Sequence, residues 1–202
     1  MDDLIRWLCH TLTCLNEVGA RCALIGGMAV SARTEPRFTR DVDLAVAVAS
    51  DTEAERVLAY LIRSGYRPMM ELDQDVAQRL ATMRLLPPGV RVNYDESDEP
   101  LLVDLLFASC GIEPEVVAAA RELEIAPGLV VPVACVPHLL AMKALSVSDK
   151  RPLDMADMQA LAKVASSEDI KLAKRLVKLI HERGYGRDRD LQAKLQEALR
   201  FR

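Results

Sequence analysis

Two aspartates that follow a pair of glycines form the pattern in this sequence that could do chemistry. Gly26 and Gly27 end a short apolar run, and thirteen residues separate them from Asp41-Val42-Asp43-Leu44. Side chains two apart on a strand point to the same face, so the two carboxylates would be neighbours. Such a pair repels unless it is solvated or binds a cation, and its oxygens suit Mg²⁺ together with substrate phosphates. The Gly-Gly turn would let backbone amides approach a phosphate closely.

A third aspartate lies inside the uninterrupted apolar run over residues 101–107, which is typical of a central strand that is buried on both faces. A charge on Asp104 would cost on the order of several kcal/mol there unless it is paired or metal-bound. Two interpretations stay open. Asp104 forms a buried salt bridge or faces solvent, or it is the third carboxylate of a site that holds two metal ions.

The elements that must position these residues follow from apolar periodicity and from turn residues. The pattern predicts helices over residues 3–18, 28–32, 50–64, 73–80, 114–121, 137–147, 154–165, 168–183 and 190–201. It predicts strands near 22–25, 41–48, 66–70, 82–86 and 101–107, a turn at 87–89, a strand or loop at 91–94, and a hairpin over 123–136. The fold class is therefore α/β (α+β), with a mixed sheet in a core over residues 1–136 and a helical part over 137–202.

Composition narrows the class of protein. With 202 residues, 50% of them apolar and 28% charged, the chain is globular rather than disordered or collagenous. No stretch approaches the roughly 20 apolar residues that cross a bilayer, and an acidic pair follows Met1 where a secretory signal is basic. Five cysteines without a C-x-x-C pair are expected to be reduced and to bind no zinc. We expect a soluble cytoplasmic protein.

Charge is distributed unevenly along the chain. Residues 1–162 carry a net charge of −9, whereas residues 163–202 carry +5. The basic end could contact a polyanion, or it could be a solvated helical surface, and the sequence favours neither. Aromatic residues make up only 4% of the chain, which argues against a base-stacking platform of the kind that single-strand binders use.

The three-part pattern resembles the polymerase-β-like nucleotidyltransferase superfamily. Its strand ending in hydrophobic-Gly-Gly, its Asp-hydrophobic-Asp-hydrophobic segment and its later strand aspartate are matched at 25–27, at 41–44 and at Asp104. In that superfamily the three carboxylates hold two Mg²⁺ ions around the triphosphate of an NTP. The second glycine position is often Ser in relatives, so here the backbone of Gly27 must serve the phosphates alone.

A second block, over residues 132–143 and 150–157, narrows the resemblance to the AbiEii toxins and the related MenT toxins, whose helix lysine and R-x-x-D-x-x-D-like segment it matches. The resemblance covers about residues 20–165. Lys143 stands in an apolar helical stripe, so it either extends to solvent or binds the triphosphate in a cleft. Asp154 would be its companion acid, whereas Asp157 is expected to cap the helix or to pair locally.

Arginines precede the first aspartate pair, in the segment over residues 33–40. Arg37 and Arg40 would line the mouth of the cleft, where the forked guanidinium suits phosphate. A solvated loop is the alternative, and it applies more to Arg33 than to Arg40.

The resemblance implies an enzyme that transfers NMP from an NTP to an acceptor hydroxyl, as the toxin of a toxin–antitoxin system. Asp41 and Asp43 would bind two Mg²⁺ ions, and Asp104 would bind one and help to deprotonate the acceptor. Gly26 and Gly27 would hold the phosphates, and Lys143, with Asp154 as its companion acid, would neutralise charge as pyrophosphate leaves.

The acceptor implied by the toxin branch is the 3′ end of a tRNA, with the basic C-terminal helices on its backbone and an antitoxin as a possible protein partner. Three alternatives stay open. The acceptor could be a small molecule such as an antibiotic, or a protein side chain, and the chain could be an inactive nucleotide-binding module.

Overall fold

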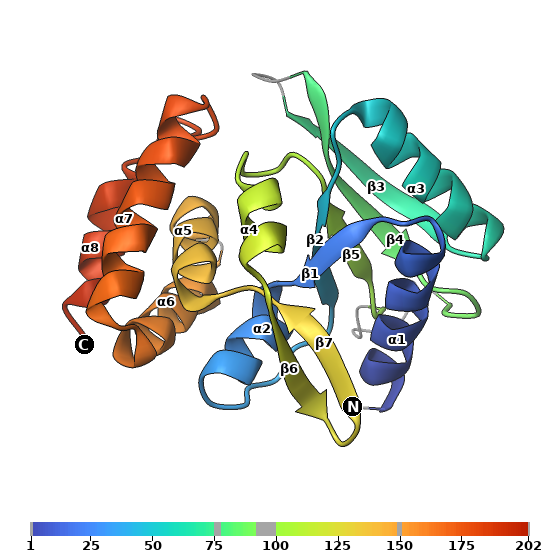
Figure 1. Ribbon diagram of the computed structural model, residues 1–202, viewed down its shortest axis with the longest axis horizontal. Coiled ribbons are helices and arrows are strands. Elements are labelled where there is room, and N and C mark those ends of the chain that lie inside the picture. The colour runs from blue at the N-terminus through green and yellow to red at the C-terminus, as the bar shows by residue number, and fades with distance from the viewer. Residues whose placement is uncertain (1, 75–77, 92–99, 149–150, 202) are drawn as a thin grey trace.

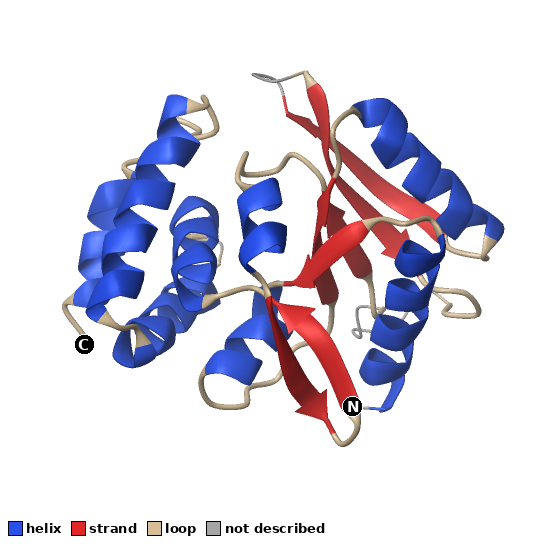
Figure 2. Ribbon diagram, viewed as in Figure 1, coloured by secondary structure: helices blue, strands red, loops and turns tan. Residues whose placement is uncertain are grey.

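The computed structural model describes residues 2–74, 78–91, 100–148 and 151–201 and contains one seven-stranded sheet flanked by helices (Figures 1 and 2). The strand order is β3-β4-β5-β2-β1-β7-β6. The strands are β1 (Arg21–Leu24), β2 (Val42–Ala47), β3 (Arg67–Gln74), β4 (Arg79–Leu86), β5 (Val103–Leu106), β6 (Arg121–Ala126) and β7 (Leu129–Val133). The pairs β2–β5 and β1–β7 are parallel and the others are antiparallel, so the sheet is mixed, as the sequence predicts.

Eight helices are present in the described part of the chain. They are α1 (Asp2–Glu17), α2 (Gly26–Arg33), α3 (Asp51–Arg63), α4 (Glu113–Ala119), α5 (Val136–Ser146), α6 (Pro152–Val164), α7 (Ser167–Glu182) and α8 (Leu191–Leu199). Helices α1 and α3 lie together near the β3–β4 side, α4 packs on β1 and β2, and α5 to α8 pack on one another at the opposite end of the molecule (Figure 1). Helix α2 connects the two parts, because it contacts β2 as well as α5 and α6.

Local sequence explains where the elements nearest the site begin and end. Ser50 caps α3 by accepting a hydrogen bond from the Glu53 amide at 3.3 Å, and Gly65 ends it with φ +94°. Val103 and Leu105 are fully buried in β5, which lies between β4 and β2. The prediction of a central strand around Asp104 is therefore confirmed.

The helix predicted over residues 73–80 is wrong. Asp73 and Gln74 end β3, and Arg79 and Leu80 begin β4, while residues 75–77 lie outside the described residues. Cross-strand pairing satisfies the backbone, for example Leu72 with Thr82, so the hairpin prevails over local helix preference. Of the segment over 91–94, only residue 91 is described, and it belongs to no helix or strand.

The other predicted elements are present, with ends shifted by a few residues. Helix α2 begins at Gly26 rather than at Met28, and β3 extends beyond residue 70. Helix α5 begins at Val136, close to the predicted boundary at 136/137, but the division of the chain into two domains stays a prediction. No helix in the described part of the chain combines the length and the apolar character that crossing a membrane requires.

Candidate active site

The sheet places Asp43 and Asp104 side by side. Strands β2 and β5 are parallel, and their register pairs these two residues directly. Asp41 lies one residue before β2, and its Oδ1 accepts a hydrogen bond from the Leu102 amide at 3.2 Å, just before β5 begins. The fold thus gathers the three predicted carboxylates at the start of two neighbouring central strands.

Negative charge accumulates around Asp43. Burial and the charges of Asp104 and Asp41 together raise the pKa of this carboxyl to about 6, against the opposing charges of Lys143 and Arg151. A cation bound here would relieve this repulsion.

Arg84 holds the third carboxylate. Strand β4 pairs Arg84 directly with Asp104, and the guanidinium Nε and Nη2 donate to Asp104 Oδ1 and Oδ2 at 2.8 and 2.7 Å. The interpretation of Asp104 as a member of a buried salt bridge is confirmed. The same residue is also the direct cross-strand neighbour of Asp43. Sequence reasoning missed this partner. The available signal was an arginine within the otherwise uncharged run over residues 82–86.

The two glycines are required by close packing at the start of α2. Gly26 has φ +63°, and a Cβ on it would lie 1.9 Å from Asp43 Oδ2. A Cβ on Gly27 would lie 2.6 Å from Thr39 Oγ1 and 2.9 Å from Arg37 Nη2. The first turn of α2 therefore lies directly against Asp43. The amides of a first helical turn have no partner within the helix, and such amides can bind phosphate.

Lys143 lies inside an ionic network and does not extend to solvent. Its Nζ contacts Asp154 Oδ1 at 2.5 Å and Asp157 Oδ2 at 2.7 Å, and the residue is only 8% exposed. Arg151 adds a partner to Asp154, with its Nε 3.1 Å from Oδ2. The structure thus places Asp154 as the companion of Lys143.

The local role predicted for Asp157 is wrong, because this residue bridges distant elements. Arg37, 120 residues away, donates Nε and Nη2 to Asp157 Oδ1 and Oδ2 at 2.6 and 2.7 Å. Asp157 therefore joins α6 both to Lys143 of α5 and to the α2–β2 loop. The only feature of the sequence that could have indicated this role is the position of Asp157, one helical turn after Asp154.

The other two arginines of the segment over residues 33–40 have different partners. Arg33 donates to the carbonyl oxygens of Ala134 and Val133 at 3.0 and 2.8 Å and so ties α2 to the end of β7. Arg40 lies over the Phe38 ring, with its guanidinium carbon 5.6 Å from the ring centroid. A role for Arg40 at the phosphates stays a prediction.

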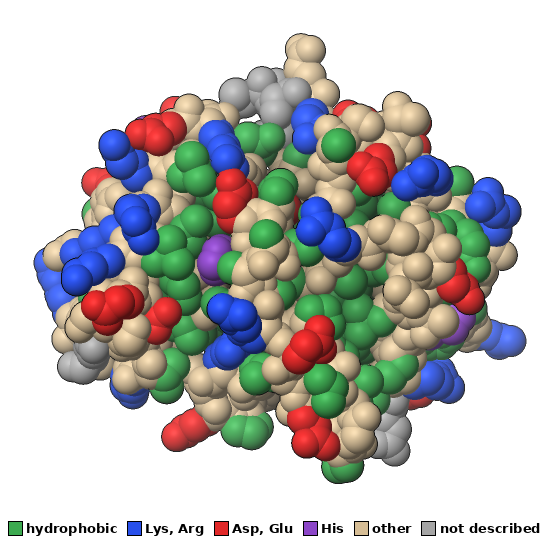
Figure 3. All heavy atoms as spheres, viewed as in Figure 1, with side chains coloured by type: hydrophobic (Ala, Val, Ile, Leu, Met, Phe, Trp, Pro, Cys, Tyr) green, Lys and Arg blue, Asp and Glu red, His purple; other side chains and the backbone are tan. Residues whose placement is uncertain are grey.

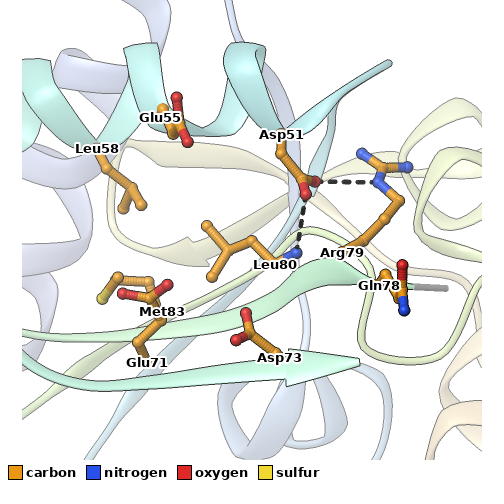
Figure 4. A pocket seen from close by; sticks show the side chains of 9 residues that line it. All are labelled: Asp51, Glu55, Leu58, Glu71, Asp73, Gln78, Arg79, Leu80 and Met83. Carbon is orange, nitrogen blue, oxygen red and sulfur yellow. Dashed lines mark hydrogen bonds and ion pairs between the residues drawn. The ribbon is translucent and has the colours of Figure 1, made fainter. Parts of the chain in front are cut away.

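A separate cavity of about 700 Å³ lies between α3 and the β3–β4 hairpin (Figure 4). Asp51 spans its edge, with Oδ1 3.1 Å from Arg79 Nε and Oδ2 3.3 Å from the Leu80 amide. The residues that line it are Asp51, Glu55, Leu58, Glu71, Asp73, Gln78, Arg79, Leu80 and Met83. None of the candidate site residues belongs to it.

The carboxylates fit a divalent cation in ligand type and in charge. Asp41 and Asp43 supply oxygen ligands, and burial together with the charges of Asp104 and Asp41 raises the pKa of Asp43, which a bound cation would lower. Within the described ranges, no group of three His, Cys, Asp or Glu side chains is arranged to hold a metal ion. Arg84 donates to both oxygens of Asp104, so it would compete with a metal ion for this third carboxylate.

The fold is that of polymerase-β-like nucleotidyltransferases. The solution structure of the antibiotic-resistance factor ANT(2'')-Ia is 19% identical, with a TM-score of 0.52 and 100% of both chains covered. The crystal structure of ANT(2'')-Ia with adenylyl-2''-tobramycin is 17% identical, with a TM-score of 0.53, and covers 91% of this chain and 99% of the other. At such identities the likeness shows the fold alone.

The chain belongs to the AbiEii family of nucleotidyl transferase toxins of type IV toxin–antitoxin systems, whose sequence model matches residues 10–202. It is therefore a nucleotidyltransferase, of a family that generally uses an NTP and a divalent metal. No curated protein matches the sequence.

Proposed function

We propose that this enzyme transfers NMP from an NTP to the hydroxyl at the 3′ end of a tRNA, and that it acts in this way as the toxin of a toxin–antitoxin system with an antitoxin partner. The direct pairing of Asp43 with Asp104, beside the Gly26 turn, carries the transfer chemistry. Membership of the toxin family supports the biological role.

Asp41 and Asp43 would hold two Mg²⁺ ions, with Asp104 as a further ligand to one of them. When bound, such ions neutralise triphosphate charge and polarise the phosphate that is attacked. The amides of Gly26 and Gly27 would hold the triphosphate. Because neither residue has a side chain, the start of α2 lies close to Asp43 and Thr39, beside the proposed metal site.

In the transfer step, the acceptor oxygen attacks the α-phosphorus. The bond between that phosphorus and the oxygen bridging to the β-phosphate breaks, and pyrophosphate leaves. Asp104, released from Arg84, accepts the hydroxyl proton. Because this chemistry depends mostly on positioning and electrostatics, loss of one metal-binding carboxylate should lower the rate by several orders of magnitude.

Lys143 and Arg37 would neutralise the departing pyrophosphate. An ammonium group has three donors, and Asp154 and Asp157 engage two of those on Lys143, which leaves one for a phosphate oxygen. Arg37 Nη2 lies beside Gly27, and the two hydrogen bonds to Asp157 fix the position of the Arg37 guanidinium. The network thus holds both cations in place before the substrate arrives.

The tRNA backbone would lie on α7. One face of this helix buries Ala173, Val177 and Ile180. The opposite face exposes four cationic side chains at helical spacing: Lys171, Lys174, Arg175 and Lys178. Figure 3 shows Lys and Arg side chains, with some acidic ones among them, over the region where Figure 1 places α7 and α8. Such a row suits phosphate contacts that weaken steeply with salt.

Label transfer tests this function. The purified protein is incubated with Mg²⁺, each α-labelled NTP in turn, and either total tRNA or a cell extract. Asp43→Asn is the inactive variant, and Asp3→Asn, whose side chain is 75% exposed on α1, is the matched control. We expect label on tRNA with the wild type and with the control, and none with Asp43→Asn.

Other outcomes separate the alternatives. Label on a protein or on a small solute such as an antibiotic would keep the chemistry and discard the tRNA acceptor. Binding of Mg-NTP without transfer to any acceptor would leave an inactive nucleotide-binding module. Raising salt from about 50 to 200 mM should depress transfer to tRNA by orders of magnitude and transfer to a small molecule far less.

A further inference from the structure

Phe38 is the most exposed of the large apolar side chains in the described part of the protein, at 78%. It belongs to the loop between α2 and β2, three residues before Asp41. A lone exposed aromatic is by itself unremarkable on a protein surface. What distinguishes Phe38 is the set of residues that holds it and lies against it.

The backbone at Phe38 is fixed from the buried ionic network. Arg37, bound through two hydrogen bonds to Asp157, also donates Nη1 to the carbonyl oxygen of Phe38 at 2.9 Å. The next residue, Thr39, lies against Gly27. The Phe38 ring therefore projects from a loop that is anchored on both sides of it, beside the phosphate-binding turn.

Arg40 lies over the ring, with its guanidinium carbon 5.6 Å from the centroid. Thr39, between these two residues, lies against Gly27. The Phe38 ring and the Arg40 guanidinium therefore pair with each other next to the Gly26–Gly27 turn. An aromatic ring paired with a guanidinium suits a nucleobase, which stacks on the ring, with a neighbouring phosphate paired to the cation.

We propose that Phe38 and Arg40 stack a nucleobase of the acceptor strand near the 3′ end that enters the site. The inference rests on the proposed transfer to a nucleic acid and names where that acceptor is gripped. It needs a single aromatic side chain, so the low aromatic content of the sequence, which excludes an extended platform, is compatible with it.

A Phe38→Trp variant provides the readout, because indole fluorescence is quenched when a base stacks on it. The only other tryptophan, Trp7, is 8% exposed on α1, so the wild type measures the background. The variant is titrated without metal with tRNA, with an NTP, and with inorganic tripolyphosphate, which lacks a base. We expect quenching by tRNA, and little by tripolyphosphate.

Phe38→Leu keeps an apolar side chain but removes the aromatic face, and should weaken tRNA binding by about tenfold. Val130→Ala, at another exposed apolar position (56%) in the β6–β7 hairpin, is the matched control and should leave binding unchanged.

Quenching by the NTP but not by tRNA would overturn the assignment to the acceptor, because the base stacked would then be that of the nucleotide. No quenching by either, with tRNA affinity unchanged in Phe38→Leu, would overturn the stacking site altogether. Quenching by tRNA without any label transfer would support the stacking site while the proposed function failed, so the two are tested separately.

Discussion

Arg84 and Asp104 face each other across β4 and β5, and the guanidinium engages both carboxylate oxygens at 2.8 and 2.7 Å. Asp104 is in turn the direct neighbour of Asp43 on β2. One cation and two carboxylates therefore lie in a row across three adjacent strands. Arg84 thus brings positive charge directly to Asp104, through a hydrogen bond to each carboxylate oxygen.

Arg84→Gln is expected to raise the affinity of the site for Mn²⁺ by about tenfold, because it removes a charge-assisted pair that competes for Asp104. Free Mn²⁺ measured by electron paramagnetic resonance gives the dissociation constant without any substrate. Arg84→Lys keeps the competing charge and should stay nearer the wild type. Unchanged or weaker Mn²⁺ binding in Arg84→Gln would show that Arg84 remains on Asp104 when metal binds.

The stability of the metal-free protein should depend on pH through Asp43. Its folded pKa of about 6 lies above the usual value of 3.8, so between about pH 4 and 6 the folded state binds more protons than the unfolded state. The contribution of Asp43 to the free energy of unfolding therefore falls as pH rises through this window and is constant above it. Denaturant titrations in EDTA across the window measure it.

Asp43→Asn serves as the control for that pH dependence. It removes a partly buried charge, so it should be more stable than the wild type at pH 8 without metal and should lose the slope between pH 4 and 6. The same variant should not transfer label. A wild type that gains stability from pH 4 to 6 to the same extent as Asp43→Asn would contradict the assignment of the raised pKa.

Lys143→Met should lower the free energy of unfolding by about 3 kcal/mol, because it leaves Asp154 buried beside a single, largely exposed partner, Arg151. The double variant Lys143→Met/Asp154→Asn should recover most of that loss. Lys178→Met, at a 73%-exposed surface ion pair, should change stability by less than about 0.5 kcal/mol. Equal losses in both single variants would mean that the Lys143 network contributes no more than a surface pair.

Gly26→Ala should reduce transfer at least about a hundredfold, because the added Cβ would lie 1.9 Å from Asp43 Oδ2 and displace a carboxylate that we propose binds metal. Gly19→Ala is the matched control. Gly19 has a similar φ of +69° but no atom within 4 Å of its Cβ position, so it carries the backbone strain of roughly 1–2 kcal/mol without the collision. Similar activity in the two variants would show that the space at Gly26 is not needed.

Much of the site could be predicted from the sequence alone. The spacing of Asp41 and Asp43 after Gly26 predicted two neighbouring carboxylates, and the charge of Asp41 does act on Asp43, although Asp41 lies just before the strand. Asp104 stood out because a carboxylate in an apolar strand demands a partner or a metal. Lys143 stood out for the same reason within an apolar helix.

Only the tertiary structure decided what these charges contact. Arg84 reaches Asp104 through the register of β4 on β5, and Arg37 reaches Asp157 across 120 residues. The β3–β4 hairpin likewise replaces the helix expected at 73–80 because its hydrogen bonds come from a partner strand. Local periodicity determines which face a side chain occupies, whereas register and packing between distant segments determine its partner. For this protein the sequence therefore determined the chemistry of the site, and the fold decided how its charges are paired.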